Sequence, residues 1–166
     1  GVGGRAKDHF PDCMTENVVA LCDVSDSAAA EGFKTFPKAK RFKDFRVMFD
    51  EMANYIDAVI IATPDHMHFA APMAAMQLGK HVYVEKPLAH NIWQIRTLRK
   101  AAQHYKVINA MGIQGHATPG IRNIKEWYEA GVLGEVKEII AWIDGPEFDP
   151  KGYFMKPETF PPQESK

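Results

Sequence analysis

The stretch that decides the fold is residues 1–23, GVGGRAKDHFPDCMTENVVALCD. Its first six residues match the pattern G-x-G-x-x-G/A, in which glycines allow a tight turn and a close approach of the backbone to a diphosphate. Asp23 follows about 20 residues later and ends an apolar run that we predict to be a strand. A carboxylate at that spacing is typical of sites that hold the ribose hydroxyls of a dinucleotide. The alternative is an ordinary glycine turn followed by a strand that happens to end in aspartate.

Apolar periodicity extends the alternation of strands and helices beyond this stretch. We predict strands over 18–24, 39–42, 58–62, 80–84 and 107–111. We predict helices over 25–36, 43–54, 68–78, 91–105 and 119–130. Strand–helix–strand units of this length favour a parallel sheet with helices on both faces. The predicted fold class is therefore α/β, a doubly wound parallel sheet of the Rossmann type. The core is predicted to include Met73, Met76, Trp93, Trp127 and Trp142.

The two ends of the sequence suggest that the fold continues beyond it. The glycine motif normally follows a strand, so the first strand of the sheet is expected to be missing, with the strands over 18–24 and 58–62 flanking its place. Residues 134–143 alternate like a half-buried strand, and the last 23 residues hold five prolines. We predict a dinucleotide-binding domain over 1–133. Over 134–166 we predict the first strand and proline-rich arm of a truncated second domain.

Composition excludes several classes of function. The 166 residues carry a formal net charge of −1, so no overall positive field favours nucleic acid or an anionic membrane. The longest strongly apolar stretch, Ala58–Ala62, is far shorter than the ~18–20 residues of a membrane helix. Two cysteines, Cys13 and Cys22, are too few for a disulfide scaffold or a structural zinc site. Reduced thiols favour a cytoplasmic protein.

A second motif, ATPDHMH over residues 62–68, follows the most apolar predicted strand. Ligands of doubly wound sheets bind beyond the carboxyl ends of the strands, so Thr63, Pro64 and His68 are expected to face a cofactor. The pair His66 and His68 also permits a metal hypothesis, with His116 as a third ligand if its loop folds close by. We expect no metal, because capping or surface roles explain the histidines more simply.

A third motif, VEKP over residues 84–87, also follows a predicted strand. A carboxylate and a lysine at a strand end suit ribose binding and proton transfer, so Glu85 is a candidate cofactor ligand and Lys86 a candidate catalytic residue. The alternative is a surface ion pair between them. Gln114, in the loop after the next predicted strand, is expected to face the same crevice. Because Asp23 would repel a 2′-phosphate, the preferred cofactor is NAD rather than NADP.

These motifs, in this order, resemble the Gfo/Idh/MocA family of NAD(P)-dependent oxidoreductases, which act mostly on sugars and cyclitols. The resemblance covers residues 1–143 and rests on the segments GVGGRA, ALCDV, AVIIATPDHMH, GKHVYVEKPLAHN, MGIQGH and GVLGEV. It implies that the glycine loop holds the diphosphate, that the acid after the second strand holds the adenine ribose, and that the Glu-Lys-Pro motif supplies a ribose contact and an active-site lysine. The residues carried over are Gly1, Gly3, Gly4, Arg5, Asp23, Thr63, Pro64, His68, Glu85 and Lys86.

The resemblance implies an enzyme that transfers a hydride between NAD(H) and a sugar- or cyclitol-type hydroxyl. It implies a small carbohydrate-like substrate and a homo-oligomer assembled through the absent domain, and the 166 residues alone are expected to be inactive. Three alternatives stay open. The first is an NAD-dependent glycosidase of the same superfamily, the second a non-catalytic dinucleotide-binding module, and the third a metal hydrolase that uses the two histidines.

Overall fold

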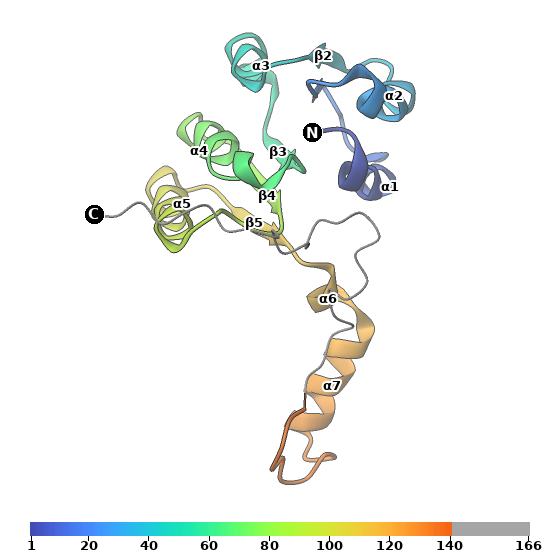
Figure 1. Cartoon of the computed structure of the whole chain (residues 1–166), viewed down its shortest axis with the longest axis vertical. Coiled ribbons are helices and arrows are strands. Elements are labelled where there is room, and N and C mark those ends of the chain that lie inside the picture. Colours follow the sequence, from blue (N-terminus) through green and yellow to red (C-terminus); the bar gives the residue numbers. More distant parts are fainter. Residues whose placement is uncertain (141–166) are drawn as a thin grey trace, which may run out of the picture. The chain divides into compact units, whose positions relative to one another are not determined.

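Parallel strands alternate with helices through the first unit of the chain, Gly1–Ile121 (Figure 1). The computed structural model describes residues 1–140. The strands are β1 (Ala20–Cys22), β2 (Lys40–Phe42), β3 (Ala58–Ile61), β4 (His81–Glu85) and β5 (Asn109–Gly112). The helices of this unit are η1 (Gly4–His9), α1 (Phe10–Cys13), α2 (Asp26–Thr35), α3 (Phe45–Met52), η2 (Ala53–Tyr55), η3 (Asp65–Met67), α4 (Ala70–Gln77), α5 (Ile92–Tyr105) and α6 (Gln114–Ala117). The predicted α/β fold is confirmed.

The strands form two parallel sheets. β1 pairs with β2, and β3, β4 and β5 pair in that order. In the described part of the chain, β1 and β3 share no backbone hydrogen bonds. This matches the predicted order, in which another strand separates them. Because the strands of each sheet run the same way, their carboxyl ends, which carry the sequence motifs, meet at one edge of that sheet.

Local sequence signals explain where the longest helices begin and end. The Ser25 hydroxyl accepts a hydrogen bond from the N–H of Ala28 at the start of α2. The Asn91 side chain accepts one from the N–H of Gln94 at the start of α5. Such caps satisfy backbone N–H groups that have no partner within the helix. α5 ends at Tyr105 and is followed by its capping residue Lys106, which adopts a left-handed conformation with φ of 55°.

The core lies between the three-stranded sheet and the helices that pack on it. Met76 of α4, Leu98 of α5 and Val84 of β4 have no exposed surface. Met76 is thus in the core as predicted, and the partly buried Met73 packs against it. The predictions for Trp93 and Trp127 are wrong, because these residues are 67% and 49% exposed, and Trp142 lies outside the described residues. Trp93 lies five positions before Leu98 in α5, about 140° around the helix from the buried face. It packs instead on Phe69, with 5.6 Å between ring centroids.

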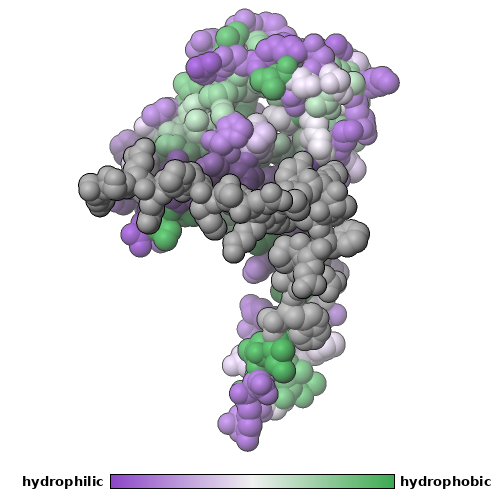
Figure 2. Space-filling model, in the orientation of Figure 1, coloured by the Kyte–Doolittle hydropathy of each residue, from purple (hydrophilic) through white to green (hydrophobic). Residues whose placement is uncertain are grey.

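A smaller apolar cluster supports the glycine loop. Val2 packs with Leu21 of β1, Ala29 of α2 and Ala39, all buried. The outer surfaces of α2 and α3 carry charged residues, and the view in Figure 2 is accordingly mostly hydrophilic over these helices. The apolar contacts of Val2 with this cluster thus anchor the glycine loop.

The second unit begins at Arg122, within α7 (Pro119–Glu129). The helix agrees with its prediction, including proline at its first residue and glycine, Gly131 with φ of 72°, beyond its end. Residues 134–140 do not form the predicted strand. A strand needs a partner for its backbone groups, and these residues pair with none in the described part of the chain. Residues 141–143 and the proline-rich arm lie outside the described residues, so the domain boundary at 133/134 stays a prediction.

Candidate functional site

The glycine loop lies against the carboxyl end of β1. The Gly1 nitrogen donates a hydrogen bond to the carbonyl of Cys22, the last residue of β1, over 3.0 Å. Gly3 approaches α2 so closely that a Cβ on it would lie 2.9 Å from the carbonyl oxygen and the Cβ of Ala28. A larger residue would force the loop away from the helix. Gly4 and Arg5 follow as the first residues of η1.

Asp23 joins the glycine loop to the end of β1. Its Oδ2 accepts hydrogen bonds from the N–H groups of Val2 at 2.8 Å and Gly3 at 3.3 Å, and its Oδ1 accepts one from Ser25 at 2.9 Å. Partial burial alone would raise the pKa of Asp23. The N–H donors of Val2, Ser25 and Gly3 stabilise the carboxylate and bring this pKa below its usual value. Asp23 is therefore a charged acceptor over the whole neutral range, as the predicted ribose contact requires.

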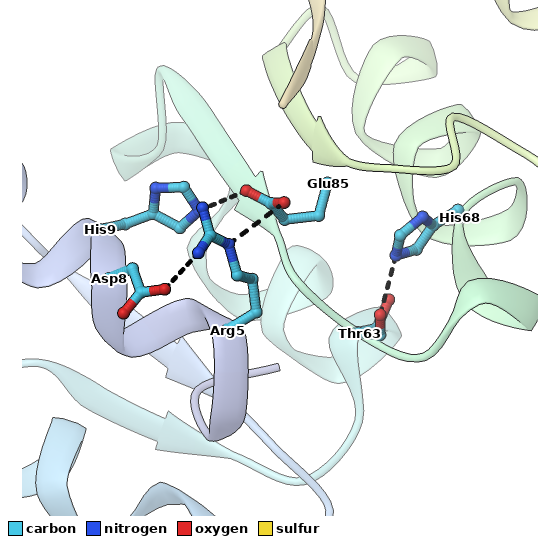
Figure 3. A network of polar contacts seen from close by, with 6 residues as sticks. All are labelled: Arg5, Asp8, His9, Thr63, His68 and Glu85. Carbon is cyan, nitrogen blue, oxygen red and sulfur yellow. Dashed lines mark hydrogen bonds and ion pairs between the residues drawn. The ribbon is translucent and has the colours of Figure 1, made fainter. Parts of the chain in front are cut away.

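Glu85, at the end of β4, joins the three-stranded sheet to the same loop (Figure 3). It is 5% exposed, and its Oε1 lies 2.8 Å from Nε2 of His9, which must donate because a carboxylate only accepts. Its Oε2 lies 3.5 Å from Nε of Arg5, and Arg5 also pairs with the exposed Asp8. On the other side, a Cβ on Gly112 would lie 2.7 Å from Oε1. The carboxylate is enclosed and charge-paired.

We expect Glu85→Gln to destabilise the folded protein by about 1–3 kcal/mol, because the amide group would turn a donor toward Arg5 or His9, which also donate. Arg5 is 41% exposed, so solvent screening favours the lower part of this range. Urea unfolding of the complete protein measures the change. Asp8→Asn is the matched control, because Asp8 pairs with the same arginine but is 60% exposed, and its effect should stay within about 0.5 kcal/mol. Equal losses in both variants would contradict the anchoring role of Glu85.

His68 is buried between two loops at the same edge. It is 1% exposed, with Nε2 2.8 Å from the carbonyl oxygen of Thr63 and Nδ1 2.5 Å from that of Pro87. Figure 3 shows the ring directed at Thr63. Both nitrogens already face acceptors, so the predicted cofactor contact would have to break one of these bonds, and it stays a prediction. His66 is exposed. Within residues 1–140, no group of three or more His, Cys, Asp or Glu side chains could hold a metal ion.

The loop after β3 also contains a polar atom without a partner. The Thr63 hydroxyl is buried and forms no hydrogen bond within the described structure. Buried hydroxyls are normally satisfied, so this one points to a group that binds at the strand ends. Pro64 is exposed and precedes η3. Thr63 and Pro64 therefore both lie in the loop that follows β3, as the sequence motif predicts.

Lys86 directly follows β4, and Gln114 lies two residues after the end of β5. Both residues therefore lie beyond the carboxyl edge of the three-stranded sheet. The register pairs Glu85 with Gly112, so the residues that follow β4 and β5 begin side by side. Lys86 is exposed and precedes a cis peptide bond to Pro87. Gln114 is exposed and starts α6. The alternative of an ion pair between Glu85 and Lys86 is wrong, because Glu85 is buried and pairs with Arg5 and His9 instead.

The structure links the predicted residues in three places, namely Asp23 with the glycine loop, Arg5 with Glu85, and His68 with Thr63. Within the described residues, neither the Lys86 nor the Gln114 side chain forms a hydrogen bond or ion pair with the others. His9 was missed by the sequence analysis. A single histidine after the glycine motif gives no signal of its own, and its role depends on a residue 76 positions away.

Comparisons with known proteins agree with this fold. A family model described as an oxidoreductase family with an NAD-binding Rossmann fold matches residues 1–113. The levoglucosan dehydrogenase of Pseudarthrobacter phenanthrenivorans is 28% identical over 116 residues, which cover 70% of this chain and 29% of that protein. The scyllo-inositol 2-dehydrogenase (NADP(+)) of Bacillus subtilis is 32% identical over 88 residues, which cover 53% of this chain and 24% of that protein.

A solved structure extends the similarity to three dimensions. The scyllo-inositol dehydrogenase of Lactobacillus casei, crystallised with bound cofactor NAD(H) and scyllo-inositol, is 25% identical and superposes with a TM-score of 0.70. The match covers 81% of this chain and 41% of that one. The chain therefore spans less than half the length of each of these relatives. No helix in the described residues is both long and apolar enough to cross a membrane.

Proposed function

The chain belongs to the Gfo/Idh/MocA family of oxidoreductases, and from this premise we propose that the complete protein transfers a hydride between NAD(H) and a hydroxyl-bearing carbon of a sugar or cyclitol. The observation that carries the proposal is the enclosed Glu85 carboxylate. It ties the end of β4 to the glycine loop, so the residue that follows it, Lys86, lies beside the candidate cofactor site.

The residues at the strand ends fit a dinucleotide. The glycine loop approaches its neighbours at distances that only glycine permits, and Asp23 presents a charged acceptor beside it. The buried Thr63 hydroxyl has no hydrogen-bond partner among the described residues, so it is able to bond to a ligand. We assign the diphosphate to the loop with Gly1, Gly3, Gly4 and Arg5. The remaining contacts are assigned to Asp23, Thr63, Pro64, Glu85 and Gln114.

Lys86 is the residue we assign to proton transfer. When bound, NAD supplies the hydride acceptor. In the oxidation direction the substrate hydroxyl loses its proton to Nζ of Lys86, and in the reduction direction Nζ returns that proton to the oxygen. The exposed side chain leaves Nζ accessible to a substrate, while the buried Glu85 next to it holds the backbone in place. The lysine thus combines a mobile side chain with an anchored backbone.

Several wider features belong to the same proposal. The relatives act on an inositol and on levoglucosan, and we propose a substrate of that polyhydroxylated class. Cys13 and Cys22 are free thiols, which supports a cytoplasmic location. A homo-oligomer formed outside residues 1–166 and the absence of nucleic-acid or membrane partners complete the proposal. The net charge of −1 supports the last point.

The experiment is an absorbance assay of the complete protein with NAD and a panel of cyclitols, anhydrosugars and sugars. We expect net NADH formation with at least one compound, and weaker activity with NADP because Asp23 repels a 2′-phosphate. Release of sugar from a glycoside without net NADH formation would replace the dehydrogenase by the glycosidase alternative. Binding of NADH with no turnover of any panel member or glycoside would favour the non-catalytic module.

A further inference from the structure

His68 is the link between the loops that follow β3 and β4. The backbone ladder between these strands ends at the pair Ile61 and Val84. Beyond that pair the two loops separate, and the only hydrogen bonds found between them in the described residues pass through the imidazole ring. One ring nitrogen reaches the Thr63 carbonyl and the other the Pro87 carbonyl. The ring therefore supplies the hydrogen-bond contacts between the two loops beyond the last pair of the ladder.

The geometry of this contact is well suited to holding a fixed distance. The imidazole is planar and rigid, and at 1% exposure it is enclosed by neighbouring atoms. Carbonyl oxygens only accept, so any hydrogen bond to either carbonyl is donated by a ring N–H. The backbone N–H of His68 is in turn bonded to the Asp65 carbonyl within η3. The ring is thus held at its own backbone as well as at its tip.

Lys86 lies between two anchored neighbours. On one side Glu85 is held by His9 and Arg5, and on the other side the carbonyl of Pro87 is held by His68. Lys86 itself is exposed and forms no ion pair in the described part of the chain. Its backbone is therefore constrained from both directions, while its side chain is not.

We infer that His68 is a positioning residue, which orients Lys86 by holding the Pro87 carbonyl against the loop after β3. The inference rests on the proposed role of Lys86 in proton transfer. It assigns to His68 an action on the rate of the chemical step through the backbone of Lys86, in place of the predicted contact with the cofactor. A displacement of about 1 Å in a reacting group can cost about 100-fold in rate, so loss of the clamp has a measurable effect.

The test is a double-mutant cycle on kcat in the complete protein, with His68→Leu, Lys86→Ala and the double variant. Leucine fills the buried site without donating a hydrogen bond. We expect His68→Leu to lower kcat about 10–100-fold, with Kd for NADH and KM changed less than about threefold. The double variant should be no slower than Lys86→Ala alone, because a residue that acts through another adds nothing once the other is gone.

Each result is decisive. If the two effects multiply in the double variant, His68 does not act through Lys86 and the inference is wrong, while the proposed function stands. If Lys86→Ala leaves kcat unchanged, the proposed role of Lys86 in proton transfer fails and the inference fails with it. His66→Ala is the control, because this exposed histidine lies two residues away in the same loop, and we expect its kcat to match the parent. If His68→Leu does not fold, His68→Gln, a polar side chain of similar length, takes its place in the cycle.

Discussion

Replacing Lys86 by alanine is expected to lower kcat by about 10²–10⁴-fold, the usual range for the loss of a general acid–base group. NADH affinity should stay nearly unchanged, because the structure leaves the lysine side chain exposed and assigns the anchoring contacts at this strand end to Glu85. Steady-state kinetics and fluorescence titration of NADH on the complete protein measure the two quantities separately.

Lys86→Arg separates proton transfer from electrostatics. Arginine keeps a positive charge but does not release its proton near neutral pH. If Lys86 transfers a proton, kcat of Lys86→Arg should therefore be nearly as low as that of Lys86→Ala. Lys100→Ala, which removes an exposed lysine from α5, is the matched control and should leave kcat unchanged. Full activity of Lys86→Ala would remove the lysine from the chemistry. A large loss of NADH affinity would make it a cofactor ligand instead.

Replacing Asp23 by alanine is expected to weaken NADH binding by about 1.5–3 kcal/mol, which is roughly a 10- to 150-fold increase in Kd. The removed group is a charge-assisted acceptor whose lowered pKa keeps it ionised at neutral pH. The same substitution removes the repulsion of a 2′-phosphate, so discrimination between NADH and NADPH should decrease. Titration of both cofactors tests both effects.

Part of the effect at Asp23 could come from the glycine loop, because the carboxylate also accepts hydrogen bonds from Val2 and Gly3. Asp23→Asn addresses this point, since an amide oxygen in the place of Oδ2 still accepts both of these hydrogen bonds while the charge is lost. Asp26→Ala is the control. Asp26 is exposed, pairs with Lys43 over 2.6 Å and lies three residues further along the chain. Unchanged NADH affinity in Asp23→Ala would overturn the assignment of the ribose to this residue.

Sequence patterns alone predicted the five strands and the longer helices of the first unit, because the signals that create them are local. Apolar periodicity marked the strands and the helices, and in the structure Ser25 and Asn91 cap the starts of two of these helices. The parallel sheets followed from the alternation of strands and helices. The motifs at the strand ends therefore came to lie where the sequence placed them. The expected strand over 134–143 depends on a partner strand, which no local pattern can supply.

The tertiary structure alone decided what each site residue contacts. Glu85 could have paired with the adjacent Lys86, and only the packing of η1 against β4 brings Arg5 and His9 to it from about 80 residues away. His68 has the same local sequence whether its ring faces a cofactor or a core, and the structure buries it against two carbonyl groups. Local sequence specifies conformation because neighbouring residues set the backbone. The partner of a buried polar group depends on which distant elements pack together, and that is a property of the folded chain.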